Sequence, residues 1–321
     1  MRDRSIVGYH VVYRIEDRAR PSRVNASTEV VEVRRPYGGR VEVRDPSGVR
    51  SGRVTSRRHL WVLGERGELR FGVLRPPGPP ARDASLAALR DASRAGQARA
   101  TGSGIVAGRT CAWFAYRKPA PDALAPPTKN ERIESCVDAS GIVLREVWTI
   151  GGRSVRLIEA LRVSEAAASA SRLLEGKDPD TEKVTEPEAA DLVRTGTLVA
   201  DVVRDRERTP LKVESPAGWK ADRASVVAIS AGEGQPTQFL SETFLRDRRL
   251  AIVEIASSAQ LAPPWGTDEG EQIRLKSGQG RVLYFIDRVE IRLLSAIGFA
   301  RVIAPSREIA LDFANGLAPA R

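Results

Sequence analysis

The sequence predicts an α+β fold that is mostly antiparallel β-sheet, and three observations support that prediction. Apolar and polar residues alternate with period two in many short stretches, as in strands that bury one face. Neighbouring stretches are separated by a few turn-forming residues, which is too short a connection for parallel strands. Patterns with helical period are few, so a curved sheet with one or two short helices is expected in the first half.

In the first half, the residues Gly8–Ile15 show the alternation most clearly, with Tyr9, Val11, Tyr13 and Ile15 on one side. Similar stretches follow along the chain and predict further strands. These are Glu29–Val33, Arg40–Arg44, Leu60–Leu63, Glu68–Leu74, Cys111–Arg117, Arg132–Val137, Ile142–Ile150 and Ser154–Val163.

Two short helices are expected in the same half. Asp83 is a suitable N-cap for a helix that runs through about Arg94. Ser164 is a suitable N-cap for a second helix, Glu165–Leu174, and Gly176 suits the position after its end.

The segment Lys177–Glu186 (KDPDTEKVTE) is acidic and polar and contains Pro179, so it is the best candidate for a linker. A chain of 321 residues exceeds the size at which one core usually keeps growing. We therefore expect a first domain at residues 1–176, a linker at 177–186 and a smaller α+β domain at 187–321.

The second half begins with a capping box, Thr185 with Glu188, which predicts a helix through Arg194. A helix capped by Ser306 and ended near Gly316 is expected to close the chain. The predicted strands between them are Thr197–Val203, Leu211–Val213, Ser225–Ser230, Gln238–Phe244, Leu250–Ala256, Gly280–Ile286, Arg288–Leu294 and Phe299–Ile303.

Positive charge is concentrated in the first half. The whole chain has a net charge of +10, and residues 1–163 hold 30 Lys and Arg against 17 Asp and Glu. Two interpretations stay open: a GC-rich genome that encodes Arg at solvated positions, or a surface that meets an anionic lipid, an acidic peptide or a nucleic acid. Aromatic and basic residues are not gathered in any one segment, which argues against a nucleic-acid platform.

The residues offer little for catalysis. The stretch Gly102–Gly108 has the spacing GxGxxxG and precedes a predicted strand, which does not fit a dinucleotide loop. The two histidines, His10 and His59, are expected to be structural or surface residues rather than bases. We therefore predict no catalytic residues, no cofactor and no metal site, and we expect the protein not to be an enzyme.

The two cysteines lie in two predicted strands joined by a Pro-rich loop, so the strands can pair and bring Cys111 and Cys136 together. A bridge closing about 25 residues would contribute roughly 3 kcal/mol to stability. A disulfide with no CxxC motif points to an oxidising compartment. The alternative is a reduced protein with two ordinary small apolar residues.

Three segments, together with Pro216-Ala217-Gly218-Trp219, resemble periplasmic regulators of the RseB/MucB type, whose first domain is similar to the LolA-like lipoprotein carriers. The three segments are Val33-Arg34-Arg35-Pro36-Tyr37 leading to Arg40–Val43, Gly104–Cys111, and Cys136–Glu146 with its D-x-x-G turn. The resemblance implies a half-barrel sheet around short helices, followed by a smaller domain that ends in a helix.

The resemblance further implies an extracytoplasmic binding or sensor protein that holds a lipid, an acylated ligand or a polypeptide in an apolar concavity. Its partner would be such a ligand or a membrane-anchored protein, with peripheral contact to an anionic membrane and no nucleic acid. The first residues show no apolar segment of the kind found in leaders, so we expect the leader to be absent from this chain. The large residues that could line the concavity are Tyr9, Tyr13, Trp61, Phe71, Trp113 and Trp148.

Two alternatives remain at this point. One is a structural or interaction protein that has the same fold with a filled core, and the other is an enzyme of unknown type.

Overall fold

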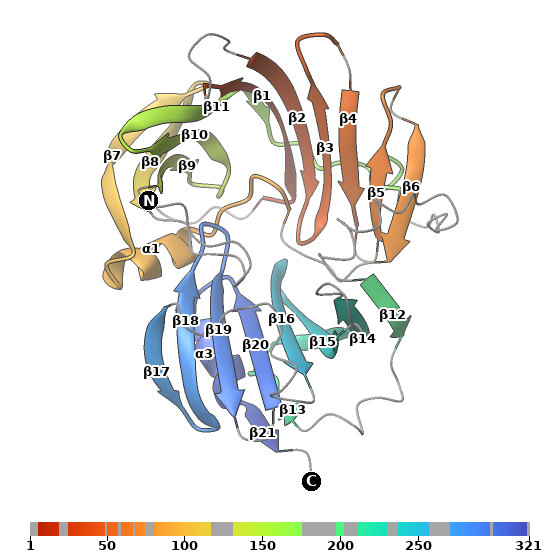
Figure 1. The fold of residues 1–321 in the computed structure, drawn as a ribbon, viewed down its shortest axis with the longest axis vertical. Coiled ribbons are helices and arrows are strands. Elements are labelled where there is room, and N and C mark those ends of the chain that lie inside the picture. Colours follow the sequence, from red (N-terminus) through yellow and green to blue (C-terminus); the bar gives the residue numbers. More distant parts are fainter. Residues whose placement is uncertain are drawn as a thin grey trace.

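The computed structural model places two β-sheets one above the other, with a helix between them (Figure 1). The structure describes residues 6–18, 25–48, 50–56, 59–66, 68–74, 80–116, 131–174, 197–201, 211–229, 237–256, 270–295 and 298–319.

The first sheet is antiparallel, strongly curved and has eleven strands in the order β6-β5-β4-β3-β2-β1-β11-β10-β9-β8-β7. Each of the nine strands predicted from alternation in this half overlaps an observed strand, which confirms the mostly antiparallel β class. The strands are β1 (Gly8–Asp17), β2 (Asn25–Arg34), β3 (Gly38–Arg44), β4 (Arg50–Thr55), β5 (His59–Leu63), β6 (Leu69–Leu74), β7 (Ala98–Val106), β8 (Arg109–Tyr116), β9 (Glu131–Asp138), β10 (Val143–Ile150) and β11 (Arg153–Ser164).

Two strands of this sheet, β4 and β7, have no alternating pattern in the sequence. β4 reads RSGRVT, and β7 reads ARATGSGIV and is exposed along most of its length. Both are held by hydrogen bonding to a neighbour with a clear pattern, β4 to β3 and β7 to β8. The glycine-rich stretch Gly102–Gly108 is therefore the β7–β8 hairpin, in agreement with the reading that it is not a dinucleotide loop.

The pairing register assigns side chains of the first sheet to two faces. Tyr9, Val11, Tyr13 and Ile15 alternate along β1 and therefore lie on one side of the sheet, which we call the inner face. Directly paired residues share a face, so the register extends this assignment to the neighbouring strands. This face also receives the segment after Pro80, since the Tyr9 hydroxyl donates to the carbonyl oxygen of Ala81 at 3.0 Å. The opposite, outer face carries His10 and its cross-strand neighbours.

The first predicted helix is present as α1 (Leu86–Arg94), but its cap differs from the prediction. The N-cap is Ser85, whose side chain accepts from the backbone N–H of Ala88, and not Asp83. Asp83 lies two residues earlier, where its carboxylate binds the guanidinium of Arg35. A buried arginine therefore uses the carboxylate that the sequence pattern assigned to capping.

The predicted helix Glu165–Leu174 is wrong. This segment runs along the outer face of the first sheet and contains only turns near its end. Ala168 donates its N–H to Val33, and Ala168 and Leu173 pack with Trp61. Burial of these two apolar residues against the sheet competes successfully with an isolated helix of ten residues, which is marginal by itself.

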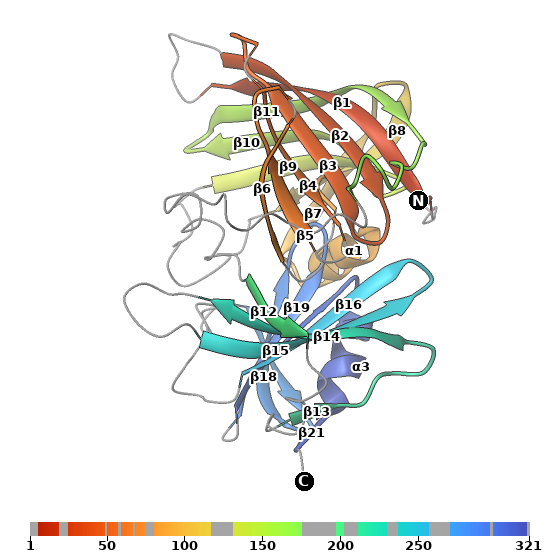
Figure 2. The same ribbon diagram turned by 90° about the vertical axis from the view of Figure 1, so that its right-hand side faces the viewer.

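The second sheet has eight strands in the order β12-β14-β15-β16-β20-β19-β18-β17 and lies beneath the first (Figure 2). Each strand predicted in this half overlaps an observed one, and β17 and β21 are additional. The strands are β12 (Thr197–Asp201), β14 (Lys220–Ile229), β15 (Thr237–Arg246), β16 (Arg249–Ala256), β17 (Glu271–Leu275), β18 (Gly278–Tyr284), β19 (Val289–Ser295) and β20 (Gly298–Ala304), with β13 (Leu211–Val213) pairing β21 (Leu317–Pro319) separately.

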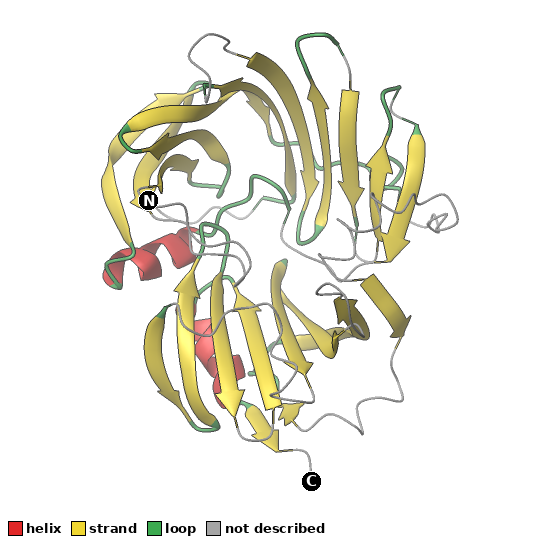
Figure 3. Ribbon diagram, in the orientation of Figure 1, coloured by secondary structure: helices red, strands yellow, loops and turns green. Residues whose placement is uncertain are grey.

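The predicted closing helix is confirmed as α3 (Arg307–Asn315), which lies against the second sheet (Figure 3). Ser306 caps it by accepting from the N–H of Ile309, and Gly316 follows its last residue. Ala310, Phe313 and Ala314 are buried against the sheet. Phe313 meets Trp219 edge to face at 5.4 Å, so Trp219 of the Pro216–Trp219 motif belongs to this core.

Helix α1 joins the two units. Leu86 and Leu89 pack against Phe114 and neighbouring residues of the first sheet, while Ala88 and Ala92 belong to the core of the second unit. Polar contacts add to this: the Asp91 carboxylate accepts from the first N–H of α3, at Arg307, and the Ser85 hydroxyl donates to Pro305. The helix is thus shared between both cores.

The predicted linker 177–186 and the predicted helix through Arg194 lie outside the described residues, so the domain boundaries remain predictions. Among the residues that the structure describes, no helix is long and apolar enough to cross a membrane.

Candidate functional site

The junction between the two sheets is built on a largely shielded ion pair within the first unit. The Arg35 guanidinium binds both carboxylate oxygens of Asp83, with Nη2 to Oδ1 at 2.6 Å and Nε to Oδ2 at 3.0 Å. The same guanidinium lies over the ring of Tyr9, 5.7 Å from its centre. Burial raises the pKa of the Asp83 carboxyl, although Arg35 acts in the opposite direction. Both groups are more than 80% covered, so the pair is costly to break.

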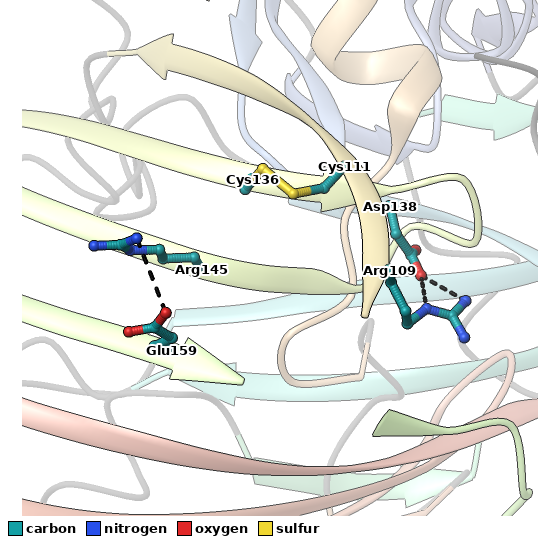
Figure 4. The surroundings of a disulfide bond; sticks show 6 residues. All are labelled: Arg109, Cys111, Cys136, Asp138, Arg145 and Glu159. Atoms are coloured by element: carbon teal, nitrogen blue, oxygen red, sulfur yellow. Dashed lines mark hydrogen bonds and ion pairs between the residues drawn. A yellow bond between two sulfur atoms is a disulfide. The ribbon is translucent and has the colours of Figure 1, made fainter. Parts of the chain in front are cut away.

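The D-x-x-G turn after β9 supports this pair. Asp138 is buried, and its Oδ1 accepts from the backbone N–H groups of Ser140 and Ile142 at 2.8 and 2.9 Å. Its Oδ2 accepts from Arg109 Nε at 2.7 Å (Figure 4). The turn then presents the carbonyl oxygen of Ser140 to Arg35. The strongest sequence motif of the chain is therefore a structural support of the junction.

The glycine of this turn, Gly141, is required by its surroundings. Its φ is +79°, in the left-handed region that favours glycine, and a side chain here would lie 2.5 Å from the carbonyl oxygen of Ala84. The close approach fixes the segment that carries Asp83 and the start of α1.

A second buried arginine enters the inner face of the first sheet. Arg82 Nε donates to Glu29 at 2.7 Å, and its Nη1 lies 3.8 Å from Glu146. Its guanidinium also lies 5.7 Å from the centre of the Tyr13 ring, whose hydroxyl donates to Val143 at 2.7 Å. Burial lowers the pKa of Arg82, but the Glu29 and Glu146 carboxylates outweigh burial and raise it. The residue stays charged at every pH the protein meets.

The second unit brings its own buried charges to the junction. Arg288 binds Asp287 and Glu290, each at 2.9 Å, and Glu290 also binds Arg292 at 3.1 Å. Burial disfavours ionisation of Glu290, but Arg288, Arg301 and Arg292 outweigh burial and lower its pKa to about 2. Glu290 is therefore ionised near neutral pH.

The tight turn between β15 and β16 forms the remaining wall and has an unusual backbone. Its two central residues, Asp247 and Arg248, have φ of +47° and +63°, which is the left-handed region normally occupied by Asn-Gly in such hairpins. Non-glycine residues there cost of order 1 kcal/mol each. Arg246, Arg248 and Arg249 are exposed, and the side chains of Arg248 and Arg249 form no ion pair or hydrogen bond with the described residues.

These walls enclose a cleft of about 360 Å³ between the first and second units. It is lined by five arginines against three aspartates, and it is bordered by the start of α1 and by Pro305. The charged residues are Arg35, Arg246, Arg248, Arg249 and Arg288, with Asp83, Asp247 and Asp287. Since Arg35 and Arg288 are neutralised by their partners, the free positive charge comes from the β15–β16 turn. The cleft is suited to an anionic group.

A second cavity, of about 430 Å³, lies on the other side of the segment Pro80–Asp83, against the inner face of the first sheet. Its walls include the aromatic side chains of Tyr116, Trp148 and Phe285 together with Glu146.

The structure divides the six aromatic candidates between the two faces of the first sheet. Tyr9, Tyr13 and Trp148 share the inner face, and Tyr9 and Tyr13 are fully buried there. Trp61 and Trp113 fall on the outer face by register, since Trp61 pairs with Val54 and Trp113 with Cys136. By register these two lie on the face opposite Tyr9 and Tyr13, although Trp113 packs against the edge of the same buried cluster.

Phe71, the sixth candidate, lies in β6 and pairs with Val62 of β5, and its side chain lies outside the described part of the structure. Of the six, Trp148 alone is among the residues that line the second cavity.

The predicted disulfide between Cys111 and Cys136 is confirmed, with the two Cα atoms 5.4 Å apart (Figure 4). The cysteines are diagonal neighbours on β8 and β9, because Trp113 and not Cys111 is directly opposite Cys136. Both are buried. The two histidines line neither the cleft nor the second cavity: His59 stacks on Trp61 at 4.8 Å, on the outer-face side.

Sequence reasoning missed the residues that build the junction, namely Arg35, Arg82, Asp83, Glu29 and Glu146. Their partners lie 48 to 64 positions away, and no local pattern encodes such pairs. A signal existed for two of them, because Arg35 stands in the segment Val33–Tyr37 and Glu146 ends the segment Cys136–Glu146, and both segments support the family resemblance.

Comparisons with known proteins give a likeness of fold. Neither a protein-family model nor a curated protein sequence matches the chain. Among solved structures, MucB in complex with MucA(peri) is similar over 98% of this chain and 94% of its own, with 14% identity and a TM-score of 0.32. The Pseudomonas aeruginosa MucA/MucB complex gives the same coverage and identity, with a TM-score of 0.33.

A third solved structure, an uncharacterized conserved protein from Thermus thermophilus, is similar over 54% of this chain and 86% of its own, with 13% identity and a TM-score of 0.35.

Proposed function

We propose that this chain is an extracytoplasmic binding protein, not an enzyme, and that it takes an acidic segment of a partner polypeptide into the cleft between its two units. The observation that carries the proposal is the β15–β16 turn, which places Arg248 and Arg249 at the cleft with no partner of their own among the described residues.

The electrostatics of the cleft support an anionic occupant. Arg35 and Arg288, which line the cleft, each have a carboxylate partner, so these two arginines give the cleft shape rather than net charge. The exposed arginines are free to form charge-assisted, bidentate hydrogen bonds with carboxylates, which are among the stronger polar contacts. The left-handed backbone at Arg248 supports the same reading, because strain of this kind often accompanies binding sites.

The disulfide supports the extracytoplasmic part of the proposal. Bridges such as Cys111–Cys136 persist in oxidising compartments and are rare in the cytosol. A membrane-anchored protein would be one source of the acidic segment, and the sensor role would follow if its binding depends on a second ligand.

A lipid or acylated molecule is the second candidate ligand, and the cavity of about 430 Å³ beside Trp148 favours it. That volume is within the range of small-ligand pockets. In this candidate, Tyr9 and Tyr13 would form the floor of the concavity as buried core. An anionic head group would then be held by the arginines of the adjoining cleft.

The test is binding of a fluorescein-labelled peptide with alternating Glu and Leu, followed by anisotropy. Arg248→Ala/Arg249→Ala should weaken binding by about tenfold or more, on the order of two charge-assisted contacts. The matched control is Arg153→Ala/Arg162→Ala, which removes the same charge from exposed positions of β11. An equal loss of peptide affinity in both double variants would show that binding depends on net charge alone, and this would overturn the assignment of the cleft.

The second candidate is tested in parallel with a fluorescent fatty acid and with phosphatidylglycerol vesicles, at low and high salt. Saturable fatty-acid binding with no peptide binding would replace the polypeptide by a lipid as the ligand.

A further inference from the structure

We infer that the cavity beside Trp148 is a binding site for an alkylammonium cation, the chemical class of choline and of ammonium head groups. The cavity adjoins the cationic cleft and shares Asp83, Asp287 and Arg288 with it, but its lining holds three carboxylates, those of Asp83, Glu146 and Asp287, against the guanidiniums of Arg82 and Arg288. The assignment rests on the carboxylate and the aromatic side chains that the inner face of the first sheet presents to this cavity.

The first step is the buried charge of Glu146. Glu146 lies on β10 and is 6% exposed. Its Oε2 accepts from the Ser135 hydroxyl at 3.2 Å, and its Oε1 accepts from Trp148 Nε1 at 2.5 Å. Both donors are neutral, so they orient the carboxylate without cancelling its charge.

The second step is the shortage of positive charge around it. Among the described residues, Arg82 is the one cation recorded within 4 Å of Glu146, at 3.8 Å, and its Nε is already bound to Glu29 at 2.7 Å. The nearby Asp83 and Asp287 have their own arginines, Arg35 and Arg288. Two carboxylates thus share one guanidinium, which leaves one negative charge in a place where uncompensated charge is expensive.

The third step is the wall of the cavity. Tyr116, Trp148 and Phe285 line it together with Glu146, Arg82 and Arg288. The Arg288 guanidinium lies 4.2 Å from the centre of the Phe285 ring and covers one of its faces. Tyr116 is tied to the Glu146 network through its hydroxyl, 3.3 Å from Ser135 Oγ. Aromatic faces attract cations through the ring quadrupole, and aromatic cages are the usual receptors for quaternary ammonium groups. A carboxylate behind such a cage adds the charge that a neutral cage lacks.

The fold already places one organic cation, the guanidinium of Arg82, next to Glu146. Arg82 holds its guanidinium between the Glu29 and Glu146 carboxylates and over the ring of Tyr13, and it does so from a backbone with φ of +62°. The inner face therefore stabilises an organic cation on one side of Glu146. Arg82 also lines the cavity, where a second cation beside Glu146 would complete the charge.

A metal ion is a poorer occupant. In the described part of the chain no group of three or more His, Cys, Asp or Glu residues is arranged to hold one. Hard cations need six or more oxygen ligands, whereas an alkylammonium group needs one carboxylate and apolar or aromatic contacts.

The experiment is isothermal titration calorimetry of the full chain with choline and with its neutral carbon analogue, 3,3-dimethylbutan-1-ol. The two compounds have the same shape and differ in charge. We expect saturable binding of choline and at least ~10-fold weaker binding of the analogue, the order expected when a charge-assisted contact is lost. Equal binding of both, or binding of neither, would overturn the assignment.

Two variants locate the site. Glu146→Gln keeps the size of the side chain and removes its charge, and it should abolish choline binding. The control is Glu134→Gln on the neighbouring strand β9, where the carboxylate is paired with Arg132 at the surface. Wild-type affinity in Glu146→Gln would contradict the proposal.

Because a buried substitution can impair folding, Phe285→Leu provides an independent variant from the second unit, checked by thermal unfolding. It keeps apolar volume and removes one aromatic face, so choline binding should weaken several-fold. If a folded Phe285→Leu variant keeps the wild-type choline affinity, the aromatic side chain does not contribute to binding and the proposal is overturned.

Vesicles distinguish the two sources of such a group. Glu146-dependent sedimentation with phosphatidylcholine vesicles, and not with phosphatidylglycerol vesicles, would assign the site to a lipid head group. Choline binding with no sedimentation would assign it to a soluble ligand. The acidic peptide is not used here, so failure of this site leaves the proposed function to its own test.

Discussion

At the scale of single residues, the junction depends on carboxylates that each serve several partners. Asp138 satisfies two backbone N–H groups and a guanidinium, and the turn it builds reaches Arg35 through the carbonyl oxygen of Ser140. Buried groups of this kind are costly to leave unpaired. Single substitutions here should therefore affect both stability and the shape of the cleft.

Substitution of Asp138 provides the first prediction. Asp138→Ala removes all three hydrogen bonds and should lower the free energy of unfolding by about 3 kcal/mol. Asp138→Asn keeps an oxygen that can accept from the two backbone N–H groups, so its loss should be smaller. Urea denaturation followed by circular dichroism measures both, and equal losses would show that the backbone contacts are unimportant.

The second prediction concerns pH and Glu290. Its pKa is about 2 in the folded protein, against the ordinary value of 4.5 for a glutamate in the unfolded chain. Ionised Glu290 therefore stabilises the fold above pH 4.5. That contribution, on the order of 3 kcal/mol, should disappear as the pH falls from about 5 to 2. Asp83 and Glu254 act oppositely, because their folded pKa values are raised and their contribution is lost as pH rises.

Comparison of the wild type with Glu290→Gln isolates the effect of Glu290. The difference in unfolding free energy should be largest near neutral pH and should shrink below pH 4. A difference that stays constant from pH 7 to 3 would contradict the lowered pKa.

At the scale of secondary structure, alternation predicted strands well where one face is buried and poorly elsewhere. β1 alternates because Tyr9, Val11 and Tyr13 fill the inner face. β7 is exposed along most of its length, so no burial pattern marks it. The same limit explains the wrong helix at Glu165–Leu174, whose apolar residues are buried by a distant strand rather than by helical packing.

The site was harder to predict than the strands for a related reason. Its charged residues pair across the fold, as Arg35 with Asp83 and Arg82 with Glu29. The aromatic candidates were grouped by size, and the register then separated Trp61 and Trp113 from Tyr9 and Tyr13. Cys111 and Cys136 were predictable because a single hairpin contains both.

The disulfide provides the third prediction. It closes a separation of 25 residues, so Cys111→Ala/Cys136→Ala should destabilise the chain by about 3 kcal/mol. Titration of free thiols in denatured, unreduced protein from an oxidising compartment should find none. Two titratable thiols in that material would contradict the bridge.

At the scale of the whole molecule, α1 makes the two units behave as one body. Ala88 and Ala92 are buried in the core of the second unit, although the helix belongs to the first half of the chain. We therefore expect the proposed cleft between the units to keep its shape when it is empty, which would lower the entropic cost of binding.

Limited proteolysis provides the fourth prediction. From its sequence, the segment Lys177–Glu186 should be cut first. The two fragments should then elute together in gel filtration, because α1 holds them. Ala92→Glu should separate or unfold them, whereas Gln97→Glu, at an exposed position just after α1, should not. Separate elution of the wild-type fragments would mean that the α1 contacts are too weak to join the units.

Hydrogen–deuterium exchange of the full chain with and without the acidic peptide tests most directly the claim that the cleft is the binding site. Bound peptide should protect the backbone of the β15–β16 turn, Arg246–Arg249, and of the facing segment Asp83–Leu86. Protection confined to other surfaces, such as the arginine-bearing strand β11, or no protection at saturating peptide, would contradict the account.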